Sequence, residues 1–403
     1  MLFCFLLLFL VAGTVSAQVR VQGAPFNVVY GWFPSWMPST ATAGLDASQL
    51  THLAWFSCEV DTSTGALANV GLWQTTPVVQ WAKANSVRVH LTVTCFGIEN
   101  TRALLRDPQR RTRCIADIAA ALRSRDADGV NLDLESVSSL QRTNMVTFVQ
   151  ELRDSLPNRE ITMATPAVDW TGAFDLVVLS HICDFLLLMG YDYHWSGSAT
   201  AGPVAPLDGE TYNVKRSVGT YLSGGVDPLK LVLAVPLYAR KWTVVGPTRM
   251  AATVEGAEST ALRFSSLMLM PSAYARLFDA ATSTSWFNTI EDGVARQTWW
   301  DDSLSLVMKY RYIQQQQLRG VGYWALGYDG GSPAVWNGLR SIGAPSDVHE
   351  EPRTIAETET VSVYDLRGVL LVECSRRSLE AIPFARGYYL LRSYLGSVER
   401  YVR

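Results

Sequence analysis

The segment Asp128–Glu135 places acidic and amide side chains at alternate positions, in the order Asp-Gly-Val-Asn-Leu-Asp-Leu-Glu. Successive side chains of a β-strand point to opposite faces, so Asn131, Asp133 and Glu135 share one face. Carboxyl groups held close together push each other's pKa values apart, which keeps one of them protonated near neutral pH. A protonated Glu135 beside an ionised Asp133 suits acid–base cleavage of a glycosidic bond.

Eight apolar, β-rich segments alternate with stretches of helical periodicity. Strands that alternate with helices pair in parallel, and eight of them over about 300 residues favour a closed (β/α)8 TIM barrel, an α/β fold. An open doubly wound sheet is the alternative, but no G-x-G-x-x-G motif follows the first strand. The predicted strands are 27–33, 51–57, 87–95, 128–135, 160–166, 183–191, 230–237 and 320–326, and helices are predicted at 115–125, 144–156 and 303–317.

The acidic strand also has an apolar face, formed by Val130, Leu132 and Leu134. One face of a barrel strand packs against helices and the other points into the barrel. The apolar face suits the helices, so we expect the acids to point inward. Glu135 ends the strand at the carboxyl rim, where barrel enzymes hold their catalytic groups. The alternative, a half-exposed strand with solvated acids, fits a parallel barrel poorly.

The barrel is predicted to span residues 25–342, with an inserted subdomain between its seventh and eighth strands. The interval 243–298 is too long for a bare loop. Residues 343–360 are rich in Pro and acidic residues, which is typical of a linker. Strand patterns resume at 361–365, 369–373 and 388–393, so we expect a small β-rich module over 361–403.

The amino-terminal residues 1–17 are predicted to be a signal peptide. Leu2–Val11 form an apolar run shorter than the roughly 20 residues that span a bilayer, and Val15-Ser16-Ala17 is similar to a cleavage site. A retained membrane anchor is the alternative. We therefore expect a protein that is secreted or held at the cell surface.

Composition argues against several kinds of partner. The 34 basic residues nearly balance the 37 acidic ones, which disfavours a nucleic-acid partner held by phosphate neutralisation. Five cysteines remain after the signal peptide, and we interpret them as buried thiols because their spacing fits neither a zinc site nor a disulfide lattice. The five histidines are scattered without ligand spacing, so no metal and no other cofactor is predicted.

Four motifs in order along the chain resemble glycoside hydrolase family 18, the chitinases and their relatives. The acidic strand resembles the signature D-x-x-D-x-D-x-E, with Asn131 in place of its second acid. Met189–Asp192 is similar to the family's M-x-Y-D on strand six. Val235–Trp242 is similar to P-x-Y-G-R-x-W on strand seven, and Gly322–Ala325 resembles the segment with the strand-eight tryptophan.

The resemblance implies roles for the residues that match. Glu135 would protonate the leaving oxygen and later deprotonate water, and Asp133 would stabilise an oxazolinium formed by the substrate's own acetamido group. Tyr191 would orient that group. The remaining predicted substrate-binding residues are Asp192, Trp324, Met189, Tyr238, Arg240, Asn131, Trp32 and Phe56. Core packing is the alternative role for Trp32 and Phe56, and a surface ion pair is the alternative for Arg240.

The substrate that the resemblance implies is a glycan containing β-1,4-linked N-acetylglucosamine: chitin, chito-oligosaccharides or peptidoglycan. The loop Gly190–Pro203, rich in aromatic and small residues, is expected to shape the aglycone side. Two alternatives stay open. One is a lectin-like barrel without turnover, and the other is an endo-β-N-acetylglucosaminidase acting on N-glycans.

The carboxyl-terminal segment 361–403 resembles the sorting domain of the type IX secretion system. The resemblance is carried by Val361–Leu371 and Ala385–Arg392. It implies that outer-membrane secretion machinery is a partner of this chain. A small β-sandwich that binds carbohydrate or caps the barrel is the alternative.

Overall fold

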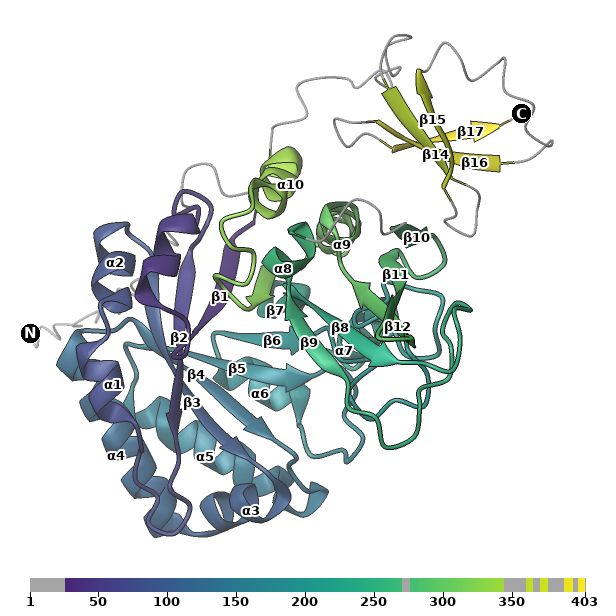
Figure 1. The fold of residues 1–403 in the computed structure, drawn as a ribbon. Coiled ribbons are helices and arrows are strands. Elements are labelled where there is room, and N and C mark those ends of the chain that lie inside the picture. Colours follow the sequence, from purple (N-terminus) through teal and green to yellow (C-terminus); the bar gives the residue numbers. More distant parts are fainter. Residues whose placement is uncertain are drawn as a thin grey trace, which may run out of the picture.

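The computed structural model describes residues 26–269 and 276–343, together with four short strands between 360 and 402. Eight parallel strands close into a barrel in the order β1-β13-β7-β6-β5-β4-β3-β2, which confirms the predicted (β/α)8 fold (Figure 1). Each overlaps one predicted strand segment. The barrel strands are β1 Val28–Pro34, β2 His52–Glu59, β3 Arg88–Phe96, β4 Gly129–Glu135, β5 Glu160–Pro166, β6 Phe185–Met189, β7 Leu231–Pro236 and β13 Gly320–Trp324.

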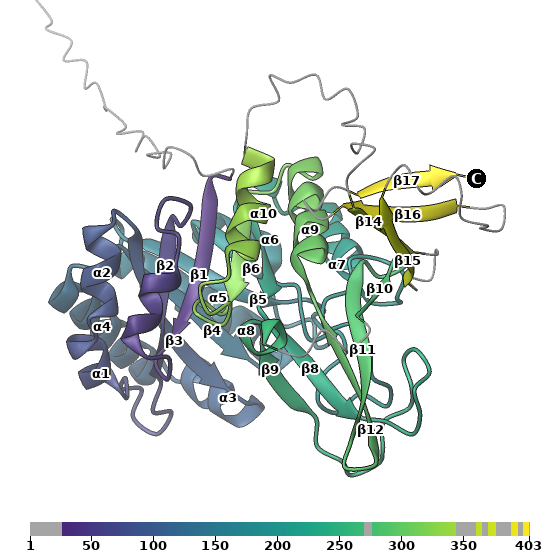
Figure 2. The ribbon, with the colours of Figure 1, turned by 45° about the horizontal axis from the view of Figure 1, so that its top comes forward.

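Helices cover the outside of the barrel, as Figure 2 shows for α1 and α2 beside β2. The helices are α1 Val70–Thr75, α2 Val78–Ala84, α3 Ile98–Arg106, α4 Pro108–Arg125, α5 Arg142–Ser155, α6 Leu176–Ile182, α7 Val214–Ser223, α9 Ser303–Gln315 and α10 Pro333–Gly343. Short 3-10 turns lie at Ser39–Gly44, Ser139–Gln141 and Pro228–Lys230.

Side-chain caps mark the first residue of α4, α6, α7 and α9, and two of them bear on the predicted bounds. Asp302 accepts a hydrogen bond from the N–H of Ser305, so α9 begins where the sequence predicts. Asp107 accepts from the N–H of Gln109, and Pro108 occupies the first turn of α4. This cap makes α4 begin at Pro108 rather than at residue 115.

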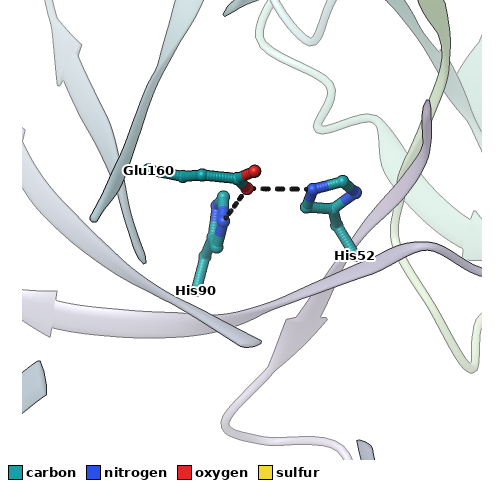
Figure 3. A group of neighbouring side chains, drawn as sticks. All are labelled: His52, His90 and Glu160. Atoms are coloured by element: carbon teal, nitrogen blue, oxygen red, sulfur yellow. Dashed lines mark hydrogen bonds and ion pairs between the residues drawn. The ribbon is translucent and has the colours of Figure 1, made fainter. Parts of the chain in front are cut away.

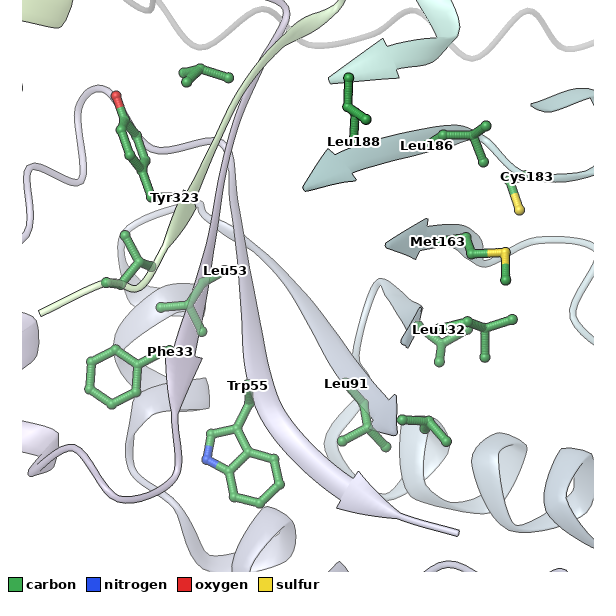
Figure 4. Close-up of a cluster of buried hydrophobic side chains, with 14 of the residues drawn as sticks. Phe33, Leu53, Trp55, Leu91, Leu132, Met163, Cys183, Leu186, Leu188 and Tyr323 are labelled. Atoms are coloured by element: carbon green, nitrogen blue, oxygen red, sulfur yellow. The ribbon is translucent and has the colours of Figure 1, made fainter. Parts of the chain in front are cut away.

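Two hydrophobic cores lie on either side of the barrel wall. The outer core fills the space between the strands and the helices, and Figure 4 shows part of it, including Leu53, Leu91, Leu132, Met163 and Leu186. The inner core fills the barrel and includes Tyr30, Trp32, Phe56, Phe185 and Leu187. The alternation along each strand sends one set outward and the other inward.

A five-stranded antiparallel sheet is inserted between β7 and β13, in the order β10-β11-β12-β8-β9. Its elements are β8 Tyr238–Thr243, β9 Thr260–Arg263, α8 Phe264–Met268, β10 Leu277–Asp279, β11 Thr284–Glu291 and β12 Val294–Trp300. The prediction that Tyr238 and Arg240 lie on barrel strand seven is therefore wrong. β7 ends at Pro236, the N–H of Leu237 still bonds the Trp324 carbonyl of β13, and from Tyr238 onward the chain pairs with β9 and β12 instead.

Near the carboxyl terminus, four strands form a second antiparallel sheet, in the order β15-β14-β16-β17. They are β14 Thr360–Tyr364, β15 Leu370–Ser375, β16 Tyr388–Ser393 and β17 Val398–Val402, of which only β17 lacks a counterpart among the predicted strands. The predicted signal peptide and residues 344–359 of the predicted linker lie outside the described residues.

Two further properties concern the described part of the chain. None of its helices is both long and apolar enough to cross a bilayer. Its barrel cysteines, Cys58, Cys95, Cys114 and Cys183, are buried and free. They pack in the outer core as small apolar side chains, which agrees with their interpretation as unpaired thiols.

Candidate active site

β4 presents its polar residues to the inside of the barrel and its leucines to the helices. Asn131 and Asp133 are buried, and Glu135 ends the strand at the exposed rim. Leu132 and Leu134 belong to the outer core. Asp133 and Glu135 therefore occupy consecutive inward positions, roughly 6.6 Å apart along the strand.

Asn131 lies below the acidic pair and does not line the cleft. The Nε1 of Trp32 donates to its Oδ1 at 2.8 Å, and its own Nδ2 donates to the Oγ1 of Thr162 at 3.1 Å. An amide both accepts and donates, so Asn131 satisfies both neighbours without an ionisable group. Its contacts support the layer beneath Asp133, and its predicted role in substrate binding stays a prediction.

The environment favours the protonated forms of both acids. Burial, and then the negative charge of Glu135, raises the pKa of Asp133 well above its ordinary value. Desolvation by the cleft walls, and then the charge of Asp192, raises the pKa of Glu135. Two such close carboxyl groups do not both ionise readily. Oδ1 of Asp133 is buried and has no hydrogen-bond partner in the described part of the chain, so it is available to a ligand.

Tyr191 and Asp192 lie in a turn after β6, and not on the strand as predicted. The strand ends at Met189 because the N–H of Tyr191 turns back to bond the Met189 carbonyl at 2.9 Å. Asp192 has a φ of 57°, in the left-handed region that Asp tolerates better than most residues. Burial, and then the charge of Asp133, raises the pKa of Tyr191 well above its ordinary value, so its hydroxyl remains a hydrogen-bond donor.

The inserted sheet holds the carboxylate of Asp192 in place. The hydroxyl of Tyr238 donates to Oδ1 of Asp192 at 2.5 Å, and the Nη2 of Arg240 lies 3.8 Å from the same oxygen. Arg240 also donates from Nη1 to Ser259 at 3.1 Å. These contacts form between the turn after β6 and a strand of a different sheet, so the insertion takes part in building the site.

Aromatic rings form one end of a cleft of about 440 Å³ above the barrel. The centroid of Trp324 lies 4.7 Å from that of Phe56 and 6.1 Å from that of Trp32, and both pairs meet edge to face. Trp324 is only partly buried, so it offers a surface to a ligand. Every predicted site residue except Asn131 lines this cleft: Glu135, Asp133, Tyr191, Asp192, Trp324, Met189, Tyr238, Arg240, Trp32 and Phe56.

The cleft has further lining residues that the sequence did not identify. Trp36, Phe96, Tyr328 and the β9 segment 261–263 complete its wall. Trp36 and Phe96 stand at or just beyond the ends of β1 and β3. Aromatic residues at carboxyl strand ends were thus a usable signal, whereas nothing in the sequence links β9 to the barrel rim.

A second hollow, of about 350 Å³, adjoins the first and shares Glu135, Met189, Tyr191 and Asp192 with it. Its outer wall contains three exposed aromatic side chains, Trp170, Trp195 and Tyr212. Trp195 belongs to the loop 190–203 that the sequence assigns to the aglycone side. Glu135 therefore lines both of two adjoining hollows.

Comparisons with known proteins agree with this architecture. Residues 28–329 match the family model of glycosyl hydrolases family 18. The cortical fragment-lytic enzyme of Bacillus anthracis is 25% identical over 303 residues, covering 69% of this chain and 65% of the relative. Di-N-acetylchitobiase of Homo sapiens is 27% identical over 260 residues, covering 57% of this chain and 66% of the relative.

Solved structures show the same fold. The chitinase of Cycas revoluta in complex with (GlcNAc)3 has a TM-score of 0.68 and 22% identity, covering 78% of this chain and 98% of that one. The chain spans 58% to 65% of the length of several curated relatives that it matches. The family model itself covers about three quarters of the chain and includes all four motifs. The chain belongs to the glycosyl hydrolases of family 18.

Proposed function

We propose that this protein hydrolyses β-1,4 bonds next to N-acetylglucosamine by retaining, substrate-assisted catalysis. The observation that carries the proposal is the convergence of Asp133, Glu135 and Tyr191 on one cleft that has Trp324 as an aromatic wall. Asp133 and Glu135 are consecutive inward residues of one strand, so both approach a sugar from the same side. This geometry does not suit attack by Asp133 from behind the ring, and the substrate's acetamido oxygen is the better nucleophile.

The first half of the reaction breaks the glycosidic bond. Glu135 transfers its proton to the leaving oxygen, while the acetamido oxygen attacks C1 and forms a cyclic oxazolinium. In the free protein burial favours the protonated form of Asp133, but the positive charge that forms on the oxazolinium favours its carboxylate. As a carboxylate, Asp133 accepts a hydrogen bond from the acetamido N–H through its free Oδ1, and its charge stabilises the cation. The Tyr191 hydroxyl donates to the acetamido oxygen and fixes its direction.

The second half regenerates the acid. Glu135, now ionised, takes a proton from a water molecule, and the oxygen of that water attacks C1. The oxazolinium ring opens and the acetamido group is restored, so the product keeps the configuration of the substrate at C1. Both halves use the carboxyl group of Glu135. This residue lines both hollows, which supports its acting in both halves.

The substrate we propose is chitin, a chito-oligosaccharide or peptidoglycan. Relatives are named as a cortical fragment-lytic enzyme and di-N-acetylchitobiase, and a similar fold has been solved with (GlcNAc)3 bound. The two adjoining hollows favour an oligosaccharide over a single sugar, because each has aromatic lining residues and Glu135 lines both.

Replacing Glu135 with Gln tests the proposal, since Gln keeps the shape but has no proton to give. We expect wild-type protein to release reducing ends from chitotetraose or peptidoglycan. E135Q should lose activity by about 10²-fold or more while still binding oligosaccharide. Glu99→Gln, on an exposed position of α3, is the matched control and should keep the wild-type rate.

The possible outcomes separate the alternatives. Turnover by E135Q at the wild-type rate would refute the assignment of the acid. Wild-type protein that binds chitotetraose but cleaves none of the glycans would be a lectin-like barrel. Cleavage of a high-mannose glycopeptide alone, among the three substrates tested together, would identify an endo-β-N-acetylglucosaminidase.

We also propose that the protein is exported through its first 17 residues and that segment 361–403 directs it across an outer membrane. The apolar run and cleavage-like site support the first step, and the resemblance to a type IX sorting domain supports the second. Deleting 361–403 should leave the protein inside the outer membrane of a host with that system. Unchanged appearance in the medium would contradict the sorting role.

A further inference from the structure

Two histidines and a glutamate converge at the end of the barrel opposite the cleft. His52 begins β2, His90 lies on β3 and Glu160 begins β5. Figure 3 shows both imidazoles directed at the Glu160 carboxylate. The register places His90 and Glu160 level with Gly129, six residues before Glu135 on β4, so the cluster lies about 20 Å from the catalytic rim.

The donor atoms have nearly the spacing of a metal site. Nε2 of His52 and Nε2 of His90 each lie 3.0 Å from the same oxygen, Oε2 of Glu160, and the three ligand atoms are within 4.8 Å of one another. In a tetrahedral zinc site with bonds of about 2.0–2.1 Å, neighbouring ligand atoms are about 3.3 Å apart. The two nitrogen–oxygen distances are therefore within about 0.3 Å of those in a zinc site.

Each of the three side chains is also held from behind, as metal ligands are in proteins. Nδ1 of His52 lies 2.7 Å from Oγ1 of Thr51, and Nδ1 of His90 lies 3.3 Å from the Tyr30 hydroxyl. Arg88 pairs with the other Glu160 oxygen, Oε1, and leaves Oε2 facing the histidines. The contacts leave both Nε2 atoms directed at one point.

The neighbouring strand β4 leaves the cluster unobstructed, and solvent has a path to it. A Cβ on Gly129 would lie 2.9 Å from Nε2 of His90 and 2.3 Å from the Glu160 carbonyl oxygen, so only glycine fits at this level of β4. Both histidines are buried, whereas the Glu160 side chain is 21% exposed. Solvent therefore reaches the carboxylate from the amino-terminal mouth of the barrel.

We infer that His52, His90 and Glu160 bind one divalent late first-row metal ion such as Zn²⁺, with solvent as the fourth ligand. Two imidazoles and a carboxylate are a donor set that suits zinc. The ion joins β2, β3 and β5 across the barrel and stabilises the fold, and it takes no part in hydrolysis. The sequence predicts no metal because the histidines are scattered along the chain, but the barrel register brings two of them together.

Zinc binding to the full chain, first stripped with a chelator, tests this inference. We expect wild-type protein to bind one Zn²⁺ per chain by calorimetry and equilibrium dialysis. The variants His52→Gln and Glu160→Gln should bind it at least tenfold more weakly. Zn²⁺ should raise the thermal unfolding midpoint of wild-type protein and not that of the variants. His181→Gln, an exposed histidine on α6, is the matched control and should behave as wild type.

Circular dichroism of each variant separates loss of the site from loss of the fold. If His52→Gln does not fold, Glu160→Gln decides the question, because Gln keeps the shape of the side chain. Replacement by Co²⁺ gives a second readout, since a four-coordinate site with these ligands absorbs strongly in the visible range. The inference is overturned if wild-type protein binds no ion, or if folded Glu160→Gln binds Zn²⁺ as tightly as wild type. The cluster would then be a hydrogen-bond network only.

Discussion

The buried ion pair between Asp301 and Lys309 offers a quantitative test of how the insertion is attached to the barrel. Asp301 directly follows β12, and Lys309 lies in the middle of α9. Nζ of Lys309 is 2.8 Å from Oδ2 of Asp301, and the two side chains are 0% and 1% exposed. Burial raises the pKa of Asp301 from 3.8 to about 6, even though the charge of Lys309 opposes the shift. Ionising Asp301 in the folded protein therefore still costs free energy, even beside Lys309.

The sign of the pH dependence follows from this pKa. A carboxyl whose pKa is higher in the folded state binds its proton more tightly there, so its contribution to stability is greatest below the unfolded pKa. That contribution is lost as the pH rises from about 4 to about 6. A shift of about two pKa units corresponds to about 3 kcal/mol.

The double variant Asp301→Asn with Lys309→Met removes both charges and keeps similar shapes. We compare the free energy of unfolding of the double variant with that of wild type at each pH. The difference, variant minus wild type, should become about 2–3 kcal/mol more positive between pH 4 and pH 7, because only wild type loses stability over this range. Lys309→Met alone leaves a buried acid without its partner and should cost about 3–5 kcal/mol at pH 7. Urea unfolding followed by tryptophan fluorescence measures each value.

An exposed ion pair provides the control for this experiment. Nζ of Lys215 lies 2.7 Å from Oδ2 of Asp208, and both side chains are about half exposed. The corresponding double variant should change stability by less than about 1 kcal/mol at either pH. If the Asp301–Lys309 double variant shows the same difference from wild type at pH 4 and pH 7, the account of a buried, costly carboxylate is wrong.

Two further predictions concern the cleft. Asp192→Asn removes a negative charge that raises the pKa of Glu135, so the alkaline limb of the pH profile of kcat/KM should move to lower pH; an unchanged or raised limb would contradict the coupling. Trp170→Ala removes an exposed ring from the second hollow. One aromatic contact contributes about 0.5–1.5 kcal/mol, so kcat/KM for chitotetraose should fall roughly 2- to 12-fold. A chromogenic substrate with a small leaving group should be cleaved at the wild-type rate, and equal losses on both substrates would argue against an aglycone role.

Local patterns predicted the barrel strands well. All eight predicted segments overlap a barrel strand, because buried parallel strands are short apolar runs bounded by turn residues. Boundaries were less certain. The signal that α4 starts at Pro108 was present in the sequence as Asp107-Pro108, a cap followed by a first-turn proline, but apolar periodicity alone starts the helix at residue 115.

The site was predicted in part. The Asp133–Glu135 pair depends on the two-residue period of one strand, so its arrangement is a local property. Tyr238 and Arg240 were assigned to the cleft but to the wrong strand, since a change of pairing partner after Pro236 leaves no local pattern. Trp36 and Phe96 were missed although their places at carboxyl strand ends were a usable signal, because a core aromatic residue occurs at such places as well. Trp170 lies in the segment after β5, where no pattern separates a residue that lines a cleft from one that packs in the core.

The sequence by itself determined which residues alternate on the acidic strand, how many strands the barrel has and in what order they follow. These properties depend on spacings of two to four residues, which chain geometry enforces wherever the segment lies. Only the tertiary structure decided that a separate sheet holds Asp192 and that His52, His90 and Glu160 meet. Such contacts join residues that are from about forty to more than a hundred positions apart in the chain. They depend on how the barrel closes and in which register its strands pair, and cooperative packing of the whole domain sets both.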